Sequence, residues 1–113
     1  MFLMKKAVWM SFDLGVKGDY EGIYRWLDSH QAKECGDTVA LFYFEPKTGN
    51  LPSEIEASVK ESVNIDSRTR IYIIFLGKDR SMKGRFLFGQ RKAAPWTGFA
   101  PTGPTEDDGD DEG

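Results

Sequence analysis

The chain has 113 residues, 40% of them hydrophobic and 13% aromatic, which suits one domain with a single modest core. The acidic residues behind its net charge of -3 are unevenly distributed: six of them lie in the last eight residues, EDDGDDEG. The rest of the chain has 12 acidic and 15 basic residues, a net charge of +3. A single cysteine excludes an internal disulfide, and no apolar run approaches the ~18 residues of a membrane span. At the N-terminus the lysines follow a short apolar stretch, whereas in a signal peptide the basic residues come first. These features predict a cytoplasmic protein without membrane contact.

The first two predicted elements are a strand and an amphipathic helix. Residues 6–13, KAVWMSFD, favour a strand and lack a helical period, and GVKG then makes a turn. Asp19 is a good N-cap for the helix that follows. The helix face expected to pack on a sheet has the i, i+3, i+4, i+7 spacing and consists of Tyr20, Ile23, Tyr24, Leu27 and Gln31.

Two strands, a second helix and two further strands follow. A short strand near residues 32–35 can pair as a hairpin with TVALFYFE, residues 38–45. Ser53 and Glu56 have the spacing of a capping box at the start of the second helix. RIYIIFLG and GRFLFGQ then predict the last two strands.

This order of elements predicts an α+β, ferredoxin-like β-α-β-β-α-β domain with an extra C-terminal strand. Both helices should cover one face of an antiparallel sheet. We expect the domain to span residues 1–100 and a disordered acidic tail to span residues 101–113, because Gly, Pro, Thr and acidic residues cannot bury enough apolar surface to become ordered.

The predicted strands are apolar on both sides. In TVALFYFE, for example, Leu41 and Tyr43 alternate with Phe42 and Phe44. A face left open by the helices would be larger than the apolar patches that monomers usually expose, and a second copy of the same sheet can cover it. The pattern therefore predicts a homodimer, with Phe42, Phe44 and Trp96 as interface candidates, whereas a tail folded back over the sheet is the alternative.

The triplet Phe12-Asp13-Leu14 ends the first strand, and VALFYFE and TRIYIIFLG stand where central strands are expected. Over roughly residues 4–96 this pattern resembles the ferredoxin-like superfamily of small CRISPR-associated adaptation endonucleases and virulence-associated protein D toxins. The resemblance implies a face-to-face dimer whose two Asp13 side chains hold Mg²⁺, or Mn²⁺ in its place. It also implies cleavage of RNA or DNA in phage defence or as a toxin, or a non-cutting structural role. The short loop after Asp13 and the acidic tail depart from the family pattern.

Asp13 is accordingly the candidate catalytic and metal-binding residue, with Ser11 two positions before it on the same face of the strand. Carboxylate oxygens suit Mg²⁺, which can activate a water and offset the charge that develops on a phosphate. Asp13 can equally cap the GVKG turn. Because no second carboxylate lies next to Asp13 in the sequence, a metal site would need the second subunit.

The segment GKDRSMKGRFLFGQRK combines aromatic residues with six basic ones that can contact phosphates: Lys78, Arg80, Lys83, Arg85, Arg91 and Lys92. The alternative is an edge hairpin whose charges prevent aggregation. The leading hypothesis is a homodimeric RNA- or DNA-binding protein with possible Mg²⁺-dependent endonuclease activity. The alternatives are a catalytically inactive structural or binding dimer of the same fold and a small-molecule-binding ferredoxin-like module.

Overall fold

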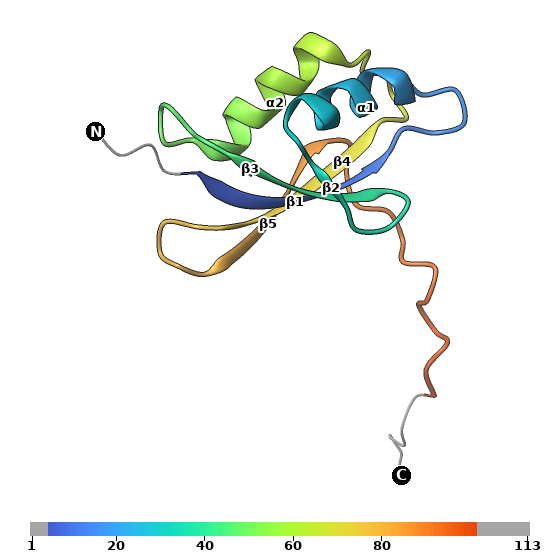
Figure 1. The fold of residues 1–113 in the computed structure, drawn as a ribbon. Coiled ribbons are helices and arrows are strands. Elements are labelled where there is room, and N and C mark those ends of the chain that lie inside the picture. Colours follow the sequence, from blue (N-terminus) through green and yellow to red (C-terminus); the bar gives the residue numbers. More distant parts are fainter. Residues whose placement is uncertain (1–4, 102–113) are drawn as a thin grey trace.

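The computed structural model describes residues 5–101, which form two helices on one face of a five-stranded sheet (Figure 1). Nearly all of the predicted acidic tail lies outside the described residues. The strands are β1 (Lys6–Asp13), β2 (Lys33–Glu34), β3 (Val39–Phe44), β4 (Arg70–Leu76) and β5 (Met82–Phe88). The helices are α1 (Tyr20–Ser29) and α2 (Leu51–Ser62). Neither helix has the length and the apolar character to cross a membrane.

The sheet has the order β2-β3-β1-β4-β5, and all of its neighbouring strands are antiparallel. The first strand therefore occupies the centre, where Val8 lies opposite Phe42 on one side and Phe75 on the other. The α+β ferredoxin-like layout predicted from the sequence is confirmed, and β5 adds the extra strand through a hairpin with β4.

The core lies between the helices and one face of the sheet. From the centre of the sheet, Val8, Met10 and Phe12 point into it and are 0–3% exposed. Trp26 of α1 packs edge-on against Phe42, with ring centroids 5.1 Å apart. Its indole N–H also donates to Ser58 Oγ on α2 at 2.9 Å, so that one side chain joins both helices to the sheet. The helix face predicted for α1 omitted Trp26 and included Tyr24, which is 54% exposed.

The two helix starts differ in how well the sequence predicted them. The Asp19 cap is confirmed, because its Oδ1 accepts the Gly22 N–H at 2.9 Å. Its Oδ2 accepts the Asn64 N–H at 2.8 Å, and these backbone hydrogen bonds lower the pKa of Asp19 below its usual value.

At Gly22 an added Cβ would clash with Asp19 Oδ2 and lie 2.7 Å from the Ser62 carbonyl oxygen, so the close contact between α1 and α2 requires glycine.

The predicted capping box of the second helix is wrong. Helix α2 starts earlier, at Leu51, and its N-cap is Asn50, whose side chain accepts the Ser53 N–H at 3.3 Å. The Glu54 carboxylate reaches back to the preceding loop and accepts from the backbone N–H groups of Lys47 and Thr48 at 2.7–3.0 Å. These bonds lower the pKa of Glu54.

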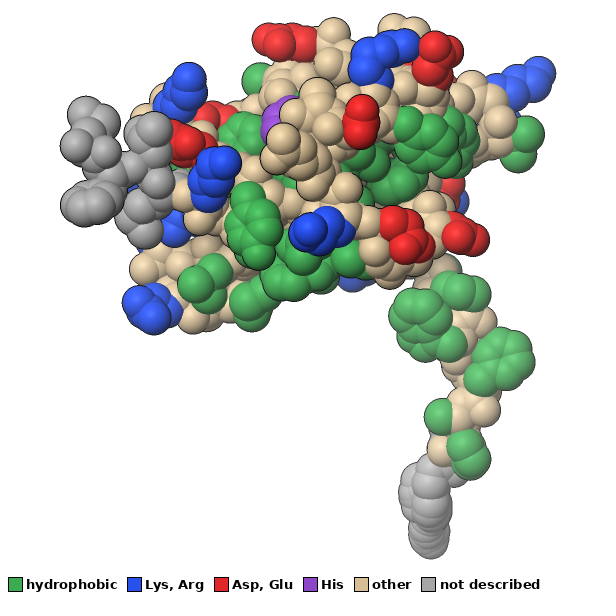
Figure 2. Space-filling model, viewed as in Figure 1, with side chains coloured by type: hydrophobic (Ala, Val, Ile, Leu, Met, Phe, Trp, Pro, Cys, Tyr) green, Lys and Arg blue, Asp and Glu red, His purple; other side chains and the backbone are tan. Residues whose placement is uncertain are grey.

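The opposite face of the sheet carries no helix, and we call it the open face. Its large apolar side chains are 39–58% exposed: Trp9, Tyr43, Ile74, Leu76 and Met82. In Figure 2, hydrophobic side chains gather along the side of the molecule that lies away from the helices.

The structure corrects the choice of Phe42 and Phe44 as interface residues. Both lie on the helix-covered side of β3: Phe42 is 1% exposed, and Phe44 packs against the core. Leu41 and Tyr43, opposite Trp9 and Ala7 of β1, are the large β3 side chains on the open face. Trp96 lies in the segment that leads away from the body after β5 and is 73% exposed.

Candidate nucleic-acid interface

Asp13 lies at the end of the sheet where β1 stops and β4 begins. It pairs with Arg70 in the β1–β4 register, and its Oδ2 is 3.9 Å from Arg70 Nη1. Its Oδ1 accepts the Gly15 N–H at 3.2 Å, which is the turn-capping role that the sequence left as the alternative. One carboxylate thus both stabilises the turn and faces a guanidinium.

Two aromatic rings position the arginines beside Asp13. Tyr72 and Phe86 pack edge to face with centroids 4.7 Å apart. The Arg91 guanidinium lies over both rings, 5.7 Å from the Tyr72 centroid and 5.6 Å from the Phe86 centroid, and Arg70 lies 5.6 Å from Phe86. A cation–π contact does not use up the N–H donors of a guanidinium, so these donors remain available to an anion.

The path of the chain after β5 brings Arg91 to this place. Gly89 has φ +79°, and an added Cβ would lie 2.7 Å from the Thr69 carbonyl oxygen, so only glycine suits this turn. One residue later, the Gln90 carbonyl accepts from Arg70 Nε at 3.3 Å. These contacts hold the segment after β5 against the start of β4.

Two adjoining hollows meet at this end of the sheet. The smaller, of about 250 Å³, is lined in part by Ser11, Tyr72 and Phe86, and the larger, of about 680 Å³, extends to the 67–68 and 89–92 segments. Asp13, Arg70 and Arg91 line both hollows. We call the four bases around them the basic end: Arg68, Arg70, Arg91 and Lys92.

The basic end suits an anion better than a metal ion. Among the described residues, Asp13 is the one carboxylate that lines the two hollows, against four bases. Within residues 5–101, no three His, Cys, Asp or Glu side chains are grouped as ligands for a metal. A divalent cation here would have one carboxylate of the described residues, already next to Arg70, and three guanidinium groups lining the same hollow. Residues 5–101 of one subunit therefore group no set of carboxylates around Asp13, and the predicted metal site would draw on Asp13 from a second copy.

The six basic residues predicted to bind nucleic acid do not form one surface. Only Arg91 and Lys92 belong to the basic end. Lys78 and Lys83 line a separate cavity at the other end of β4. Arg85 lies between these ends on the edge strand, where it pairs with Ile73.

Arg80 lies in the β4–β5 turn with φ +68°, and Asp79 holds this turn together. Asp79 accepts from the hydroxyl and the backbone N–H of Ser81, at 2.7 and 3.0 Å, and from Lys83 Nζ at 3.2 Å. These hydrogen bonds lower the pKa of Asp79 to about 2.

Arg68 and Arg70 were missed from the sequence. The sequence feature that could have indicated them is the pair of arginines in SRTR, residues 67–70, at the start of a predicted strand. Only the antiparallel β1–β4 register places Arg70 next to Asp13.

Comparison of the chain with protein families, curated proteins and solved structures gives no match.

Proposed function

We propose that this chain is a homodimeric nucleic-acid-binding protein that contacts the phosphate backbone through its basic end. The observation that carries this proposal is the pair of arginines, Arg70 and Arg91, which make cation–π contacts with Phe86 and Tyr72 and line both hollows. Guanidinium groups bind phosphate oxygens in a bidentate manner, and an arginine already held against an aromatic ring loses less conformational freedom on binding.

The same geometry favours contact with the backbone over reading of bases. The Arg91 guanidinium lies over one side of each aromatic ring, so a base cannot stack there without displacing it. Phosphate contacts position a protein on nucleic acid without distinguishing sequences. We therefore expect similar affinity for strands of different sequence and a steep dependence on salt.

The homodimer part of the proposal rests on the open face. Five large apolar side chains there are 39–58% exposed and come from neighbouring strands. A second copy presents the same apolar surface, so a two-fold contact covers both faces at once. Tyr72 and Phe86 of the basic end share this face with Ile74, so the proposed contact leaves Arg70 and Arg91 accessible only if it is centred toward the other end of the sheet, near Leu76 and Met82.

The test measures binding of labelled single-stranded RNA, single-stranded DNA and duplex DNA by fluorescence anisotropy, in EDTA and over a range of salt. Arg91→Ala should weaken binding about tenfold for all sequences and reduce the salt slope by about one. Arg25→Ala is the matched control, because this exposed arginine of α1 pairs only with Glu21 in the described part of the chain and lies away from the basic end. Equal losses in the two variants, or no binding at low salt, would contradict the proposal and favour a scaffold or a small-molecule-binding dimer.

Asp13→Asn separates phosphate binding from metal binding. The change removes the negative charge next to Arg70, so binding in EDTA should become tighter by a factor of about two to five. If Asp13 instead holds a metal that contacts the nucleic acid, the variant should bind more weakly than the wild type with Mg²⁺ or Mn²⁺. Product analysis in the same samples tests cleavage.

A further inference from the structure

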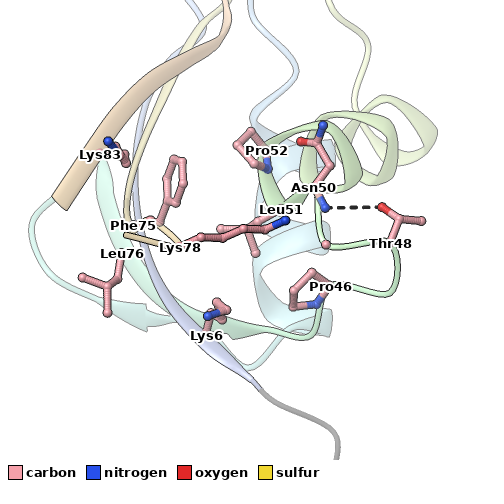
Figure 3. Close-up of a pocket in the computed structure, with 12 residues that line it drawn as sticks. Lys6, Pro46, Thr48, Asn50, Leu51, Pro52, Phe75, Leu76, Lys78 and Lys83 are labelled. Atoms are coloured by element: carbon pink, nitrogen blue, oxygen red, sulfur yellow. Dashed lines mark hydrogen bonds between the residues drawn. The ribbon is translucent and has the colours of Figure 1, made fainter. Parts of the chain in front are cut away.

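A cavity of about 500 Å³ lies at the end of β4 opposite the basic end (Figure 3). It is bounded by the 46–50 loop, the first turn of α2 and the β4–β5 turn. Its apolar lining includes the Phe75 ring, Leu51 and two prolines, Pro46 and Pro52.

Three lysines from separate parts of the chain line this cavity: Lys6 at the start of β1, Lys78 after β4 and Lys83 on β5. In Figure 3 the Lys78 side chain extends toward Leu51 at the start of α2. Its Nζ lies 3.5 Å from where a Cβ on Gly49 would be, so the ammonium reaches across the cavity to the opposite loop. Lys83 lies close over Gly77, where an added Cβ would be only 2.8 Å from Lys83 Cε.

No carboxylate of the described residues lines the cavity. Lys83 has a partner in Asp79, whereas Lys6 and Lys78 pair with no carboxylate within residues 5–101. Glu54, near the 46–50 loop, is already engaged by the Lys47 and Thr48 amides and the Thr48 hydroxyl. The cavity thus joins an apolar lining to two lysines, Lys6 and Lys78, that have no carboxylate partner among the described residues.

We propose that this cavity binds a nucleoside 5′-phosphate, either as a free nucleotide or as the 5′-phosphorylated end of a strand. The lysine ammoniums contact the phosphate, for which lysine acts as a point-charge donor. The apolar lining contacts the sugar and the base. The volume lies within the range of about 300–1,000 Å³ that is usual for ligand pockets. An uncharged nucleoside would leave the lysines unused, and inorganic phosphate would leave the apolar lining unused.

This inference does not rest on the proposed function, because β4 separates the cavity from the basic end. A chain that binds no long nucleic acid at Arg70 and Arg91 can still bind a nucleotide at Lys6 and Lys78. Loss of one activity therefore leaves the other measurable.

The test is a titration of the ¹⁵N-labelled full chain, followed by NMR, with adenosine 5′-monophosphate, adenosine and inorganic phosphate. Adenosine 5′-monophosphate should shift the amide signals of Gly49, Leu51 and Gly77, and Lys78→Ala should raise its Kd about tenfold. Lys47→Ala is the matched control: it removes a positive charge from the same loop, but the Lys47 side chain does not line the cavity. A 5′-phosphorylated and a 5′-hydroxyl tetranucleotide then distinguish a strand end from a free nucleotide.

Each outcome decides. Shifts with adenosine 5′-monophosphate alone assign a free-nucleotide site, and stronger binding of the phosphorylated tetranucleotide assigns a site for strand ends. Absence of shifts at these amides overturns the inference. So does equal binding of inorganic phosphate, or an equal loss of affinity in Lys47→Ala and Lys78→Ala.

Discussion

Ile74→Glu gives the sharpest test of the open-face dimer. Ile74 lies near the centre of the open face, between Trp9 on β1 and Gly84 on β5, and is 40% exposed. In a single subunit the new carboxylate can stay in water, so the free energy of unfolding should fall by no more than about 1 kcal/mol.

In the dimer the same carboxylate would be covered by the partner. An uncompensated buried charge costs about 3–5 kcal/mol, and two-fold symmetry places two of them in each interface, for a total of about 6–10 kcal/mol. At 1.4 kcal/mol for each factor of ten, the dissociation constant should rise by about four orders of magnitude or more.

Size-exclusion chromatography with light scattering at micromolar concentration measures this effect. The wild type should elute at twice 12.8 kDa, and Ile74→Glu should elute at 12.8 kDa with an unchanged circular dichroism spectrum. Tyr24→Glu is the control, because Tyr24 on α1 is 54% exposed but lies on the helix side, and this variant should remain a dimer. A 12.8 kDa wild type, or two variants that behave alike, would refute the reasoning.

Three further predictions test the helix contact, the β4–β5 turn and the tail. Gly22→Ala is a change that stabilises many helices. Here it should lower the free energy of unfolding by about 1–3 kcal/mol, because the new Cβ meets the Ser62 carbonyl oxygen. A raised melting temperature would contradict this. The hydrogen bonds from Ser81 and Lys83 lower the pKa of Asp79 to about 2, so its contribution to stability should be fully present above the ordinary carboxyl pKa and disappear as the pH falls through about 2. A carboxyl ¹³C titration of Asp79 with its midpoint near 4 would exclude these hydrogen bonds. We expect the six acidic charges of residues 101–113 to compete with phosphates for the basic end. Deletion of these residues should therefore tighten nucleic-acid binding at low salt and change it little at high salt; equal affinities at low salt would leave the tail without this role.

The positions of the strands were predictable because β-branched and aromatic residues fill them. Which face of each strand the helices cover was not predictable. In TVALFYFE both Phe42 and Leu41 are apolar, so alternation alone does not show which of them the helices cover. Similarly, Asn50 and Ser53 are both good N-cap residues, and the structure selects Asn50.

The candidate site depends on information that single residues do not carry. Asp13 stood out because it ends an apolar strand, but its neighbour Arg70 is far away in the sequence. The two meet only through the register of β1 with β4. Arg91 was noticed for its charge alone, whereas its position over Tyr72 and Phe86 follows from the path of the chain after Gly89.

The central position of β1 has a consequence for how the chain folds as it is synthesised. Val8 acquires its two neighbours, Phe42 and Phe75, only after β3 and then β4 have left the ribosome. Until β4 emerges, the segment VWMSF, which is rich in apolar residues, has at most β3 beside it and one unpaired edge. Such non-local pairing slows folding and exposes strand edges to other chains. We therefore expect nascent chains that end before Arg70 to be the aggregation-prone intermediates of this protein and to be the ones that chaperones retain.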